Sequence, residues 1–386
     1  MNSTTHQERS SRTRLGRALM SAGHLTSDWA PTFAAVDRAD FLPDVIWPYD
    51  MSTGQTLTLD RRENPRAWYA HADQDIPIVT QWDDGHQQGP GPGTMSTSSS
   101  SMPSVVYRLL NDLDAQPGMS VLDGGTGSGE TAAALTHRLG HGAVTTTEVD
   151  TAVARTARER LCRMGLYPHF EEGDATAHLA GASFDRILIT FGLRDFGDLV
   201  RLVRQGGLIV APFGTHYSNT DAVARLTVRG TVAEGPFLRP AEFMKARAQR
   251  TPAIAHADFV ARVSDGDRRT AAVREEDLAT ARFDPAQWAV SLRVRDVVKV
   301  VADRRDGARP VWLYGPGDKS WACIFFRDGM ETVVWQQGPR RLWDEVEAAL
   351  AWWAAHDRPA HERFGLTVAP DGIRAWLDSP ANSWRL

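Results

Sequence analysis

The sequence predicts an α/β protein built around a parallel sheet with helices on both faces. The first observation is that short apolar runs alternate with helical patterns at close spacing between Ser120 and Gly214, which is typical of consecutive βαβ units. The second is a glycine-rich turn directly after the first of these runs. The third is that the alternation stops near Arg250, where tryptophan-rich patterns begin. We therefore expect a doubly wound sheet between an N-terminal helical and loop segment and a C-terminal α+β appendage.

The N-terminal part is predicted to be helical and then turn-rich. Residues 14–25 and 30–41 have helical patterns. Residues 51–93 are rich in turn residues and close with WDDGHQQGPGPG, which predicts an ordered loop or a lid. The serine run that follows, TMSTSSSSMPS at residues 94–104, has the composition of a disordered linker. It leads, however, directly into an apolar stripe at helical spacing that begins at Val105.

The remaining elements follow from periodicity and stop signals. Central strands are predicted at 120–125, 143–149, 168–174, 184–190 and 206–214, helices at 130–140, 150–165 and 195–205, and a strand pair at 221–230 and 231–235. In the appendage, strands are predicted at 294–301, 310–314, 321–326 and 331–337, a helix at 341–356 and a hairpin at 363–377. The hairpin turns at Pro370-Asp371-Gly372, which is good turn chemistry.

Composition excludes several classes of protein. The net charge of −5 argues against a nucleic-acid partner, which needs clustered Lys and Arg. The two cysteines, Cys162 and Cys323, are too far apart for a zinc cluster, and the histidines show no ligand spacing, so we expect no bound metal. No apolar run reaches the length of a membrane span, and the N-terminus lacks the apolar stretch of a signal peptide. We expect a cytoplasmic protein with no membrane partner.

The glycine turn has the form Asp123-x-Gly125-x-Gly127-x-Gly129, after a predicted strand and before a predicted helix. Glycines allow the backbone to turn sharply and to approach a ligand closely. The spacing is not the G-x-G-x-x-G of a dinucleotide site, and the lysine of a phosphate-binding P-loop is missing. An acid followed by tightly spaced glycines suits a ligand without pyrophosphate, whose amino-acid end is held by backbone groups and a carboxylate. S-adenosylmethionine is such a ligand.

Two further acids lie where predicted strands end. Glu148 ends the second strand, about 20 residues after the glycine turn, and could accept both hydroxyls of a ribose. Asp150 is the better candidate for the cap of the following helix. Asp174 follows the third strand and could accept from an adenine amino group. The predicted cofactor site comprises Asp123, Gly125, Thr126, Gly127, Ser128, Gly129, Glu148, Asp174 and Ala175.

With these motifs the sequence resembles a class I methyltransferase, and more narrowly the protein-L-isoaspartate O-methyltransferase family. That family places T-x-S-x-P before the glycine turn, and here Ser99-x-Ser101-x-Pro103 stands in that place. DFLPDVIW, IPIVTQ and LVRQGGLIVAPFG resemble three other family segments, and the likeness covers roughly residues 30–245. There are departures: Trp82 to Thr94 is an insertion, serine replaces the motif's threonine, and Gly124 replaces a usual aliphatic residue.

The resemblance implies roles for the serine run. As the floor of the active site, it would hold the acceptor carboxylate through Ser99 and Ser101 as catalytic residues, with Ser98, Ser100 and Met102 binding substrate. A flexible linker is the alternative reading. The implied parts of the chain are 1–105 with the substrate-side loops, 106–250 with the cofactor-binding methyltransferase domain, and 251–386 with a C-terminal α+β domain for peptide recognition.

The architecture also resembles C-terminally extended actinobacterial members found with ribosomal peptide clusters, namely lanthipeptides, lasso peptides and graspetides. Those members methylate an aspartate in a modified precursor peptide. The ester closes to an aspartimide, which can hydrolyse to isoaspartate, and S-adenosylhomocysteine is released. The resemblance therefore implies such an aspartate O-methyltransferase.

Three alternatives stay open. The first is an isoaspartate repair enzyme, which does not need the appendage. The second is a tRNA base methyltransferase, which predicts basic patches and an Asn-Pro-Pro-Tyr motif; neither is evident. The third is a partner protein that binds the cofactor without transferring a methyl group. The sequence leaves the oligomeric state open.

Overall fold

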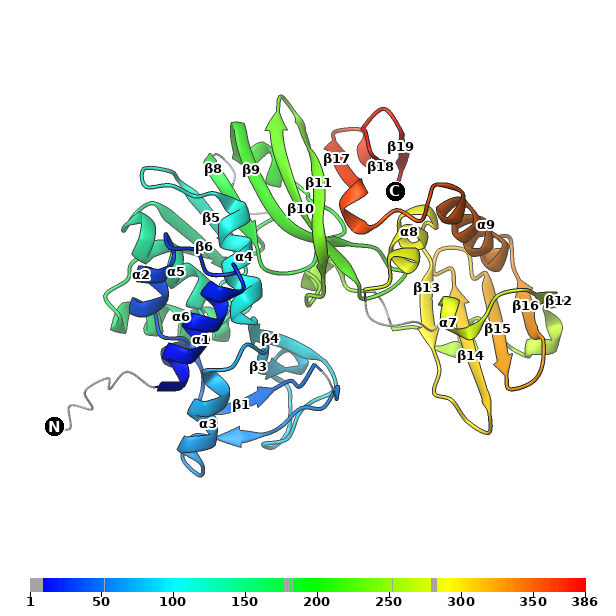
Figure 1. Cartoon of the computed structure of the whole chain (residues 1–386), viewed down its shortest axis with the longest axis horizontal. Coiled ribbons are helices and arrows are strands. Elements are labelled where there is room, and N and C mark those ends of the chain that lie inside the picture. Colours follow the sequence, from blue (N-terminus) through cyan, green and yellow to red (C-terminus); the bar gives the residue numbers. More distant parts are fainter. Residues whose placement is uncertain are drawn as a thin grey trace. The chain divides into compact units, whose positions relative to one another are not determined.

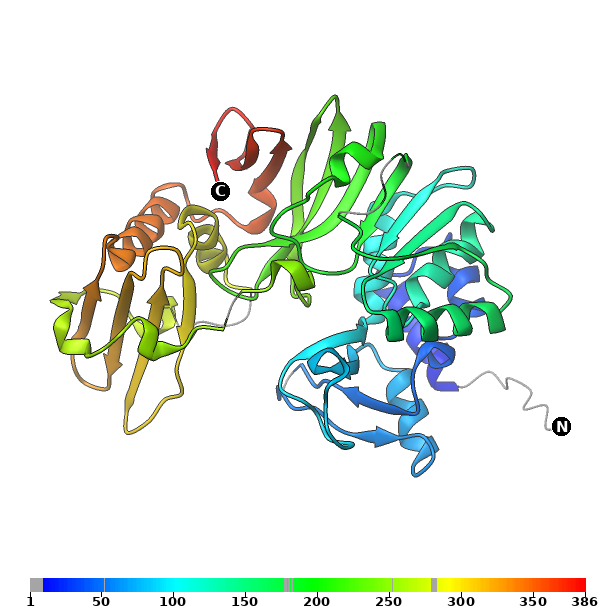
Figure 2. The ribbon, with the colours of Figure 1, turned by 180° about the vertical axis from the view of Figure 1, so that it is seen from behind.

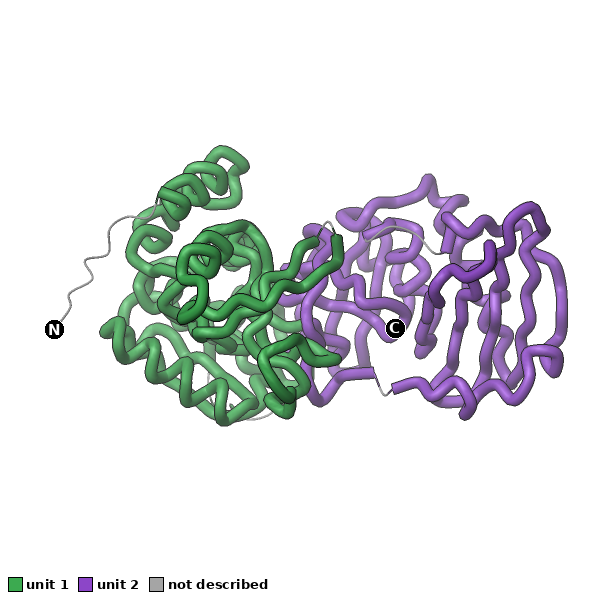
Figure 3. Tube along the Cα trace, turned by 90° about the horizontal axis from the view of Figure 1, so that it is seen from below, with its two compact units in different colours: residues 1–191, 196–210, 227–230 green, residues 192–195, 211–226, 231–386 purple. Residues whose placement is uncertain are grey.

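The computed structural model describes residues 10–51, 53–176, 179, 181, 183–251, 253–278 and 283–386. It divides the chain into two compact units (Figure 3), which are described separately. Unit 1 comprises residues up to 191 together with 196–210 and 227–230, and unit 2 comprises 192–195, 211–226 and 231–386. In the part of the chain that is described, no helix is long and apolar enough to cross a membrane.

The centre of unit 1 is a parallel sheet with the strand order β9-β8-β5-β6-β7. Its strands are β5 (Val121–Gly124), β6 (Val144–Glu148), β7 (His169–Glu172), β8 (Phe184–Ile189) and the first part of β9 (Val203–Gly214). The chain adds strands on one side of β5 and then on the other. The order therefore reverses between β5 and β8, and ligands of such sheets bind where the carboxyl ends meet at this point. The predicted doubly wound α/β fold is confirmed (Figure 1).

Helices cover this sheet as the sequence predicts, with one exception. Along the chain they are α4 (Pro103–Leu113), which contacts β8, α5 (Glu130–Leu139), which contacts β6, and α6 (Thr151–Arg163), which contacts β6 and β7. The helix predicted at 195–205 is wrong. Gly197 has a φ of 52°, and only a 3₁₀ turn at Leu199–Leu202 precedes β9. The apolar residues of this stretch are buried by that turn, which explains the misleading periodicity.

A second, antiparallel sheet in unit 1 has the order β2-β1-β3-β4. Its strands are β1 (Val45–Pro48), β2 (Leu59–Asp60), β3 (Ile78–Trp82) and β4 (Ser96–Ser100), and helix α3 (Pro65–Ala72) packs on it through the fully buried Trp68. The turn-rich residues 51–93 therefore also contain β2, α3 and β3, which were not predicted from the sequence. The serine run is strand β4, which also excludes the linker reading. Only the turn between β3 and β4 keeps the character of an ordered loop, closed where Asp83 accepts from the amides of Thr94 and Met95.

Two short helices precede this sheet. Helix α1 (Ser10–Ser21) begins before its predicted start, and α2 (Ala30–Ala35) ends before its predicted end. The chain leaves the helical conformation at Val36 and starts a 3₁₀ turn at Arg38–Phe41, because the Asp37 carboxylate accepts from the Ala39 amide and caps this new turn.

Unit 2 contains two antiparallel arrangements. The first has the order β19-β18-β17-β11-β10, and the second is a five-stranded sheet with the order β12-β16-β15-β14-β13. The elements are β10 (Asp221–Arg229), β11 (Val232–Ala241), β12 (Asp267–Ala271), α7 (Glu275–Leu278), α8 (Pro285–Arg293), β13 (Val298–Val301), β14 (Ala308–Tyr314), β15 (Trp321–Arg327), β16 (Thr332–Gln337), α9 (Leu342–Ala355), β17 (Phe364–Ala369), β18 (Gly372–Leu377) and β19 (Ser383–Arg385).

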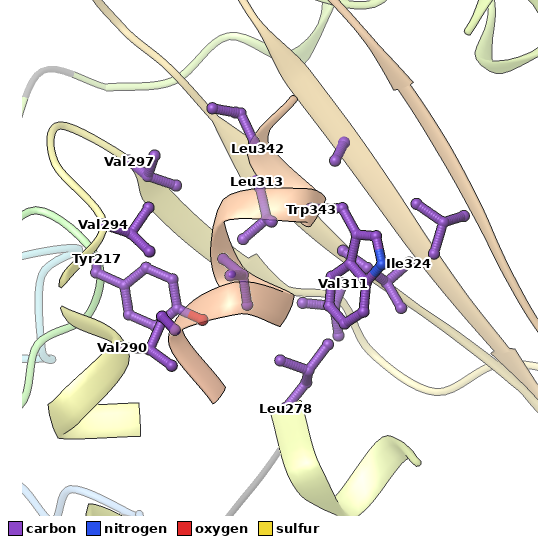
Figure 4. Packing of buried hydrophobic residues seen from close by; sticks show 14 of the residues in the cluster. Tyr217, Leu278, Val290, Val294, Val297, Val311, Leu313, Ile324, Leu342 and Trp343 are labelled. Atoms are coloured by element: carbon purple, nitrogen blue, oxygen red, sulfur yellow. The ribbon is translucent and has the colours of Figure 1, made fainter. Parts of the chain in front are cut away.

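The core of unit 2 lies between the five-stranded sheet and helices α8 and α9, which lie side by side in both ribbon views (Figures 1 and 2). Val311, Leu313 and Ile324 project from the sheet toward Leu342 and Trp343 of α9 (Figure 4). The hairpin predicted at 363–377 is present as β17 and β18. The hairpin pairs through β17 with β11. Strand β11 precedes residue 250 but belongs to the same unit as the C-terminal strands, so the two units do not divide at the domain boundary of residue 250 that the sequence implied.

Candidate cofactor and acceptor site

The glycine turn closes over the end of strand β6. Gly125, Gly127 and Gly129 all have positive φ angles, of 90°, 53° and 98°, which residues with a side chain rarely adopt. The Gly125 and Thr126 amides donate to the Thr147 carbonyl over 3.0 and 2.8 Å. A methyl group at Gly125 would also lie 2.8 Å from the Phe191 ring. The glycine pattern is therefore required by backbone conformation.

The side chains of Thr126 and Ser128 in this turn are buried. The Thr126 hydroxyl bonds the hydroxyl of Thr146 on β6 at 2.7 Å, and the Ser128 carbonyl accepts from Arg160 over 3.5 Å. With these side chains turned inward, the turn offers a ligand mainly backbone groups. That suits the amino-acid end of a cofactor held by backbone N–H and C=O groups.

Glu148 lies against the glycine turn, as its predicted role requires. Its Oε2 accepts from the Gly127 amide over 2.9 Å, and its Oε1 accepts from the Asp150 amide over 3.0 Å. A carboxylate oxygen can accept two hydrogen bonds, so these two amide contacts do not by themselves prevent Glu148 from accepting a ribose hydroxyl. Asp150 caps α6 by accepting from the Ala152 and Val153 amides, which confirms the predicted cap.

Asp123 is fully buried beneath the turn. Its Oδ2 accepts from the Thr146 hydroxyl over 2.9 Å, whereas its Oδ1 has no partner among the described residues. Burial raises the pKa of Asp123 to about 7, the Thr146 hydrogen bond opposes this, and the nearby charge of Glu148 adds to it. A buried carboxylate oxygen without a donor is costly. The amino group of an amino-acid ligand is the kind of donor that this oxygen lacks.

Asp174 and Ala175 follow strand β7 and reach the same edge of the sheet. The Asp174 Oδ1 accepts from both the amide and the hydroxyl of Thr176 over 2.8 Å, which closes a tight turn. A methyl group at Gly124 would lie 3.2 Å from the Ala175 Cβ and 2.5 Å from the Ile189 side chain. The family's usual aliphatic residue therefore does not fit at position 124 here, which explains this departure.

The serine strand β4 lies beside the glycine turn. A methyl group at Gly127 would lie 3.7 Å from the Ser99 carbonyl oxygen and 3.8 Å from the Ser98 hydroxyl. Ser99 and Ser101 are partly exposed, and their hydroxyls form no hydrogen bond within the described part of the chain. The two predicted catalytic hydroxyls are therefore available to a ligand, and they belong to a segment whose Ser99 carbonyl and Ser98 hydroxyl lie beside the turn expected to hold the cofactor.

The three predicted substrate-binding residues differ in what they can offer. The Ser98 hydroxyl is buried and accepts from Thr80 over 3.3 Å. The Ser100 hydroxyl is 2% exposed and has two internal partners, so its position is structural rather than substrate-binding. The Met102 carbonyl accepts from the Val105 and Val106 amides and begins α4.

Arg38 is a buried cation that sequence reasoning missed. Its guanidinium donates to the Ser100 hydroxyl over 2.7 Å and to the Ser100 and Ser101 carbonyls over 2.9 and 3.0 Å. Glu130 of α5 accepts from the same Ser100 hydroxyl over 2.8 Å and lies 3.7 Å from Arg38. Burial lowers the pKa of Arg38 and raises that of Glu130. This group holds the end of the serine strand to the first helix after the glycine turn.

We expect Asp123→Asn to stabilise the protein at alkaline pH more than at acidic pH. The raised pKa means that the folded protein keeps the Asp123 proton up to about pH 7, whereas an unfolded aspartate loses it near pH 4. The cost of the buried charge is absent below pH 4, grows between pH 4 and 7 and is complete above pH 7. Between pH 4 and pH 7, the free energy of unfolding of the variant should rise by on the order of a few kcal/mol relative to that of the parent.

Urea unfolding of both proteins at pH 4.5, 6 and 8 measures this difference. Asp112→Asn on α4 is the control, since it makes the same replacement at an aspartate that is only partly buried. A stability difference between Asp123→Asn and the parent that stays constant with pH would contradict the assignment.

Comparison with known proteins identifies the central part of the chain. The family model described as "Protein-L-isoaspartate(D-aspartate) O-methyltransferase (PCMT)" matches residues 62–232. A protein-L-isoaspartate O-methyltransferase from Bradyrhizobium sp. is 35% identical over 133 residues, which are 34% of this chain and 60% of that protein. One from Methanococcus vannielii is 31% identical over 135 residues, 34% of this chain and 63% of that protein. The chain thus spans about 60% of the length of these curated relatives.

A solved structure titled protein-L-isoaspartate O-methyltransferase matches the fold with a TM-score of 0.53. Its sequence is 18% identical, and the match covers 95% of this chain and 100% of the other. The glycine turn, Glu148 and Asp174 all lie within the residues that the family model matches. Residues 62–232 are therefore similar to the protein-L-isoaspartate O-methyltransferase family and have a class I methyltransferase fold, whose cofactor is S-adenosylmethionine.

Proposed function

We propose that this protein is a carboxyl O-methyltransferase that methylates an aspartate side chain in a ribosomally made, modified peptide. The observation that carries the proposal is a pair of hydroxyls without a hydrogen-bond partner among the described residues, those of Ser99 on β4 and of Ser101 directly after it. The strand they belong to lies against the glycine turn at Ser98 and Ser99. This arrangement offers hydrogen-bond donors to an acceptor group beside the expected cofactor. The cytoplasmic location predicted from the sequence stays part of this proposal.

The cofactor, when bound, supplies a methyl group attached to a sulfonium sulfur. The neutral thioether that remains after transfer is a good leaving group. Within the site, Glu148 would accept the ribose hydroxyls, Asp174 the adenine amino group, and the glycine turn the amino-acid end. The exposed Val149, which directly follows Glu148 and which the sequence analysis did not single out, adds an apolar surface there.

The acceptor needs positioning rather than activation, because a carboxylate is already ionised and nucleophilic at neutral pH. Ser99 and Ser101 would orient it by donating hydrogen bonds, and a neutral hydroxyl leaves the oxygen more nucleophilic than a cation would. Holding the reacting atoms in line can contribute about 7–11 kcal/mol. In the resulting ester, the backbone nitrogen of the next peptide residue attacks the side-chain carbonyl. Methanol leaves, and a five-membered imide remains.

The C-terminal appendage supports recognition of a peptide. Trp288, Trp321 and Trp343 are fully buried and fill the cores. Trp312 and Trp335 are only half-buried and lie on the face of the five-stranded sheet opposite α9. Cross-strand pairing aligns them in one row, which runs from Val300 through Trp312, Cys323 and Trp335 to Arg268. Aromatic and arginine side chains of this kind serve as anchors for protein ligands.

Repair of isoaspartate is the second candidate function. It is favoured by the match of the family model and by the names of the relatives. From the sequence, the appendage is expected to separate the two functions, because repair does not need it. The solved structure with the repair enzyme's title matches 95% of this chain, so the appendage by itself does not distinguish them.

The two functions differ in the substrate that gains a methyl group. We expect the protein to convert a cyclised precursor peptide, encoded next to its gene, to a product that has lost one water through a transient methyl ester. A short isoaspartyl peptide should stay unmodified. Mass spectrometry after incubation with S-adenosylmethionine measures both. Methylation of the isoaspartyl peptide alone would instead establish repair.

Removal of the Ser101 hydroxyl should lower turnover without changing cofactor binding. We expect Ser101→Ala to lower kcat about tenfold, because one orienting hydrogen bond is worth roughly 1–1.5 kcal/mol. Affinity for S-adenosylhomocysteine, measured by calorimetry, should be unchanged. Ser96→Ala, at the other end of the same strand, is the control. Full turnover in Ser101→Ala would remove this residue from the mechanism.

The half-buried tryptophans of the five-stranded sheet give a separate prediction. Trp335→Ala should raise KM for the precursor peptide several-fold, as truncation of an interface anchor costs about 1–2 kcal/mol, with little change in kcat. Met330→Ala, in the exposed turn of the same sheet, is the matched control. Steady-state kinetics with the precursor peptide measure both. An unchanged KM in a folded Trp335→Ala variant would leave these tryptophans without a part in recognition.

A further inference from the structure

A continuous set of hydrogen bonds connects the serine strand to the glycine turn. The Thr97 hydroxyl of β4 donates to the Gln81 Oε1 over 2.8 Å, and the Gln81 Nε2 donates to the Asp150 Oδ2 over 3.0 Å. The Asp150 amide donates to Glu148, and Glu148 accepts from the Gly127 amide over 2.9 Å. The side chain of Gln81 is thus the link between the sheet that carries the acceptor serines and the carboxylate expected to hold the cofactor.

The chemistry of this link requires a glutamine. A carboxylate such as Asp150 only accepts hydrogen bonds, so the amide NH₂ must face it and the amide oxygen must face Thr97. Glutamate would place two carboxylates together, and an apolar side chain would leave the Asp150 oxygen and the Thr97 hydroxyl without this partner. The side chain therefore has one productive orientation.

The backbone around Gln81 is shaped for this contact. The ladder between β3 and β4 shifts register on both sides of Gln81, between Val79 and Gln81 and again between Gln81 and Trp82. Irregularities of this kind re-aim a side chain. The far ends of the link are also anchored, since Asp150 caps α6 with its other oxygen and Thr97 accepts from the Asp84 amide of the inserted loop over 3.1 Å.

We propose that Gln81 is a positioning residue that couples occupancy of the cofactor site to the order of the serine strand. The inference rests on the proposed function in one respect, namely that Glu148 accepts the ribose of the cofactor. A ligand on Glu148 restricts that carboxylate, and through the Asp150 amide and Gln81 it restricts Thr97, the residue directly before Ser98 and Ser99. The acceptor hydroxyls are then held firmly when the methyl donor is in place, which is coupling by loss of conformational freedom.

Hydrogen exchange of the full chain, with and without S-adenosylhomocysteine, tests the coupling. In the parent protein we expect the amides of residues 96–101 to exchange about fivefold more slowly when the ligand is bound, the low end of measured site-to-site coupling. Gln81→Met has nearly the same size but forms neither hydrogen bond, and it should lose this slowing. Because coupling is reciprocal, its affinity for S-adenosylhomocysteine should change by no more than about the same factor.

Two further variants make the result specific. Thr97→Val breaks the same path at its other end and should also lose the slowing, which covers the case in which Gln81→Met folds poorly. Gln88→Met, in the inserted loop, removes an exposed glutamine that contacts only its own loop and should keep the slowing. The kcat of a Gln81 variant should fall while its KM for S-adenosylmethionine stays near the parent value.

The outcomes separate the inference from the proposed function. If the parent binds S-adenosylhomocysteine and Gln81→Met and Thr97→Val retain the slowing, the coupling is overturned alone. Faster exchange in Gln81→Met by the same factor with and without ligand would make Gln81 a static support, and this also overturns it. If calorimetry detects no binding to the parent protein, both the proposed cofactor site and the coupling fail.

Discussion

The hydrogen bond from the Gly127 amide to the Glu148 carboxylate is the constraint on which the site depends. It joins the turn after β5 to the end of β6, its neighbour in the parallel sheet, and β5 borders the point where the strand order reverses. The bond requires Gly127 to hold a positive φ, which in turn requires glycine. It also aligns Glu148, so the same contact shapes the turn and orients the carboxylate beside it.

The acceptor side is built onto this edge by charged and polar contacts. Arg38 holds the end of the serine strand to Glu130, while Gln81 holds its middle to Asp150. Five acceptors surround the Arg38 guanidinium, so this buried cation is satisfied. A strand of small hydroxyl residues has little apolar surface with which to anchor itself, and these two contacts supply the order that packing does not.

The second unit has a different physical basis. Its order comes from two arrangements of antiparallel strands and an apolar core beneath α8 and α9, in which Leu313, Leu342 and Trp343 are fully buried. Of its tryptophans, Trp343 fills this interior, whereas Trp312 and Trp335 stay half-buried on the opposite face of the sheet. Under the proposed function, these two tryptophans contribute to the peptide-binding surface.

The sequence by itself determined the features whose causes are local. The glycine spacing and the Asp150 cap follow from backbone conformation and hydrogen bonds within a few residues, and the structure has both. Only tertiary structure decided that the serine run is a strand and that Arg38 and Gln81 hold it in place. The hydrogen-bond partners of Arg38 and Gln81 lie 62 and 69 residues away in the chain, and no pattern within a short window encodes such a contact. The helix expected at 195–205 was wrong for the related reason that burial by a turn, anchored at Gly197, can leave the same apolar spacing as a helix.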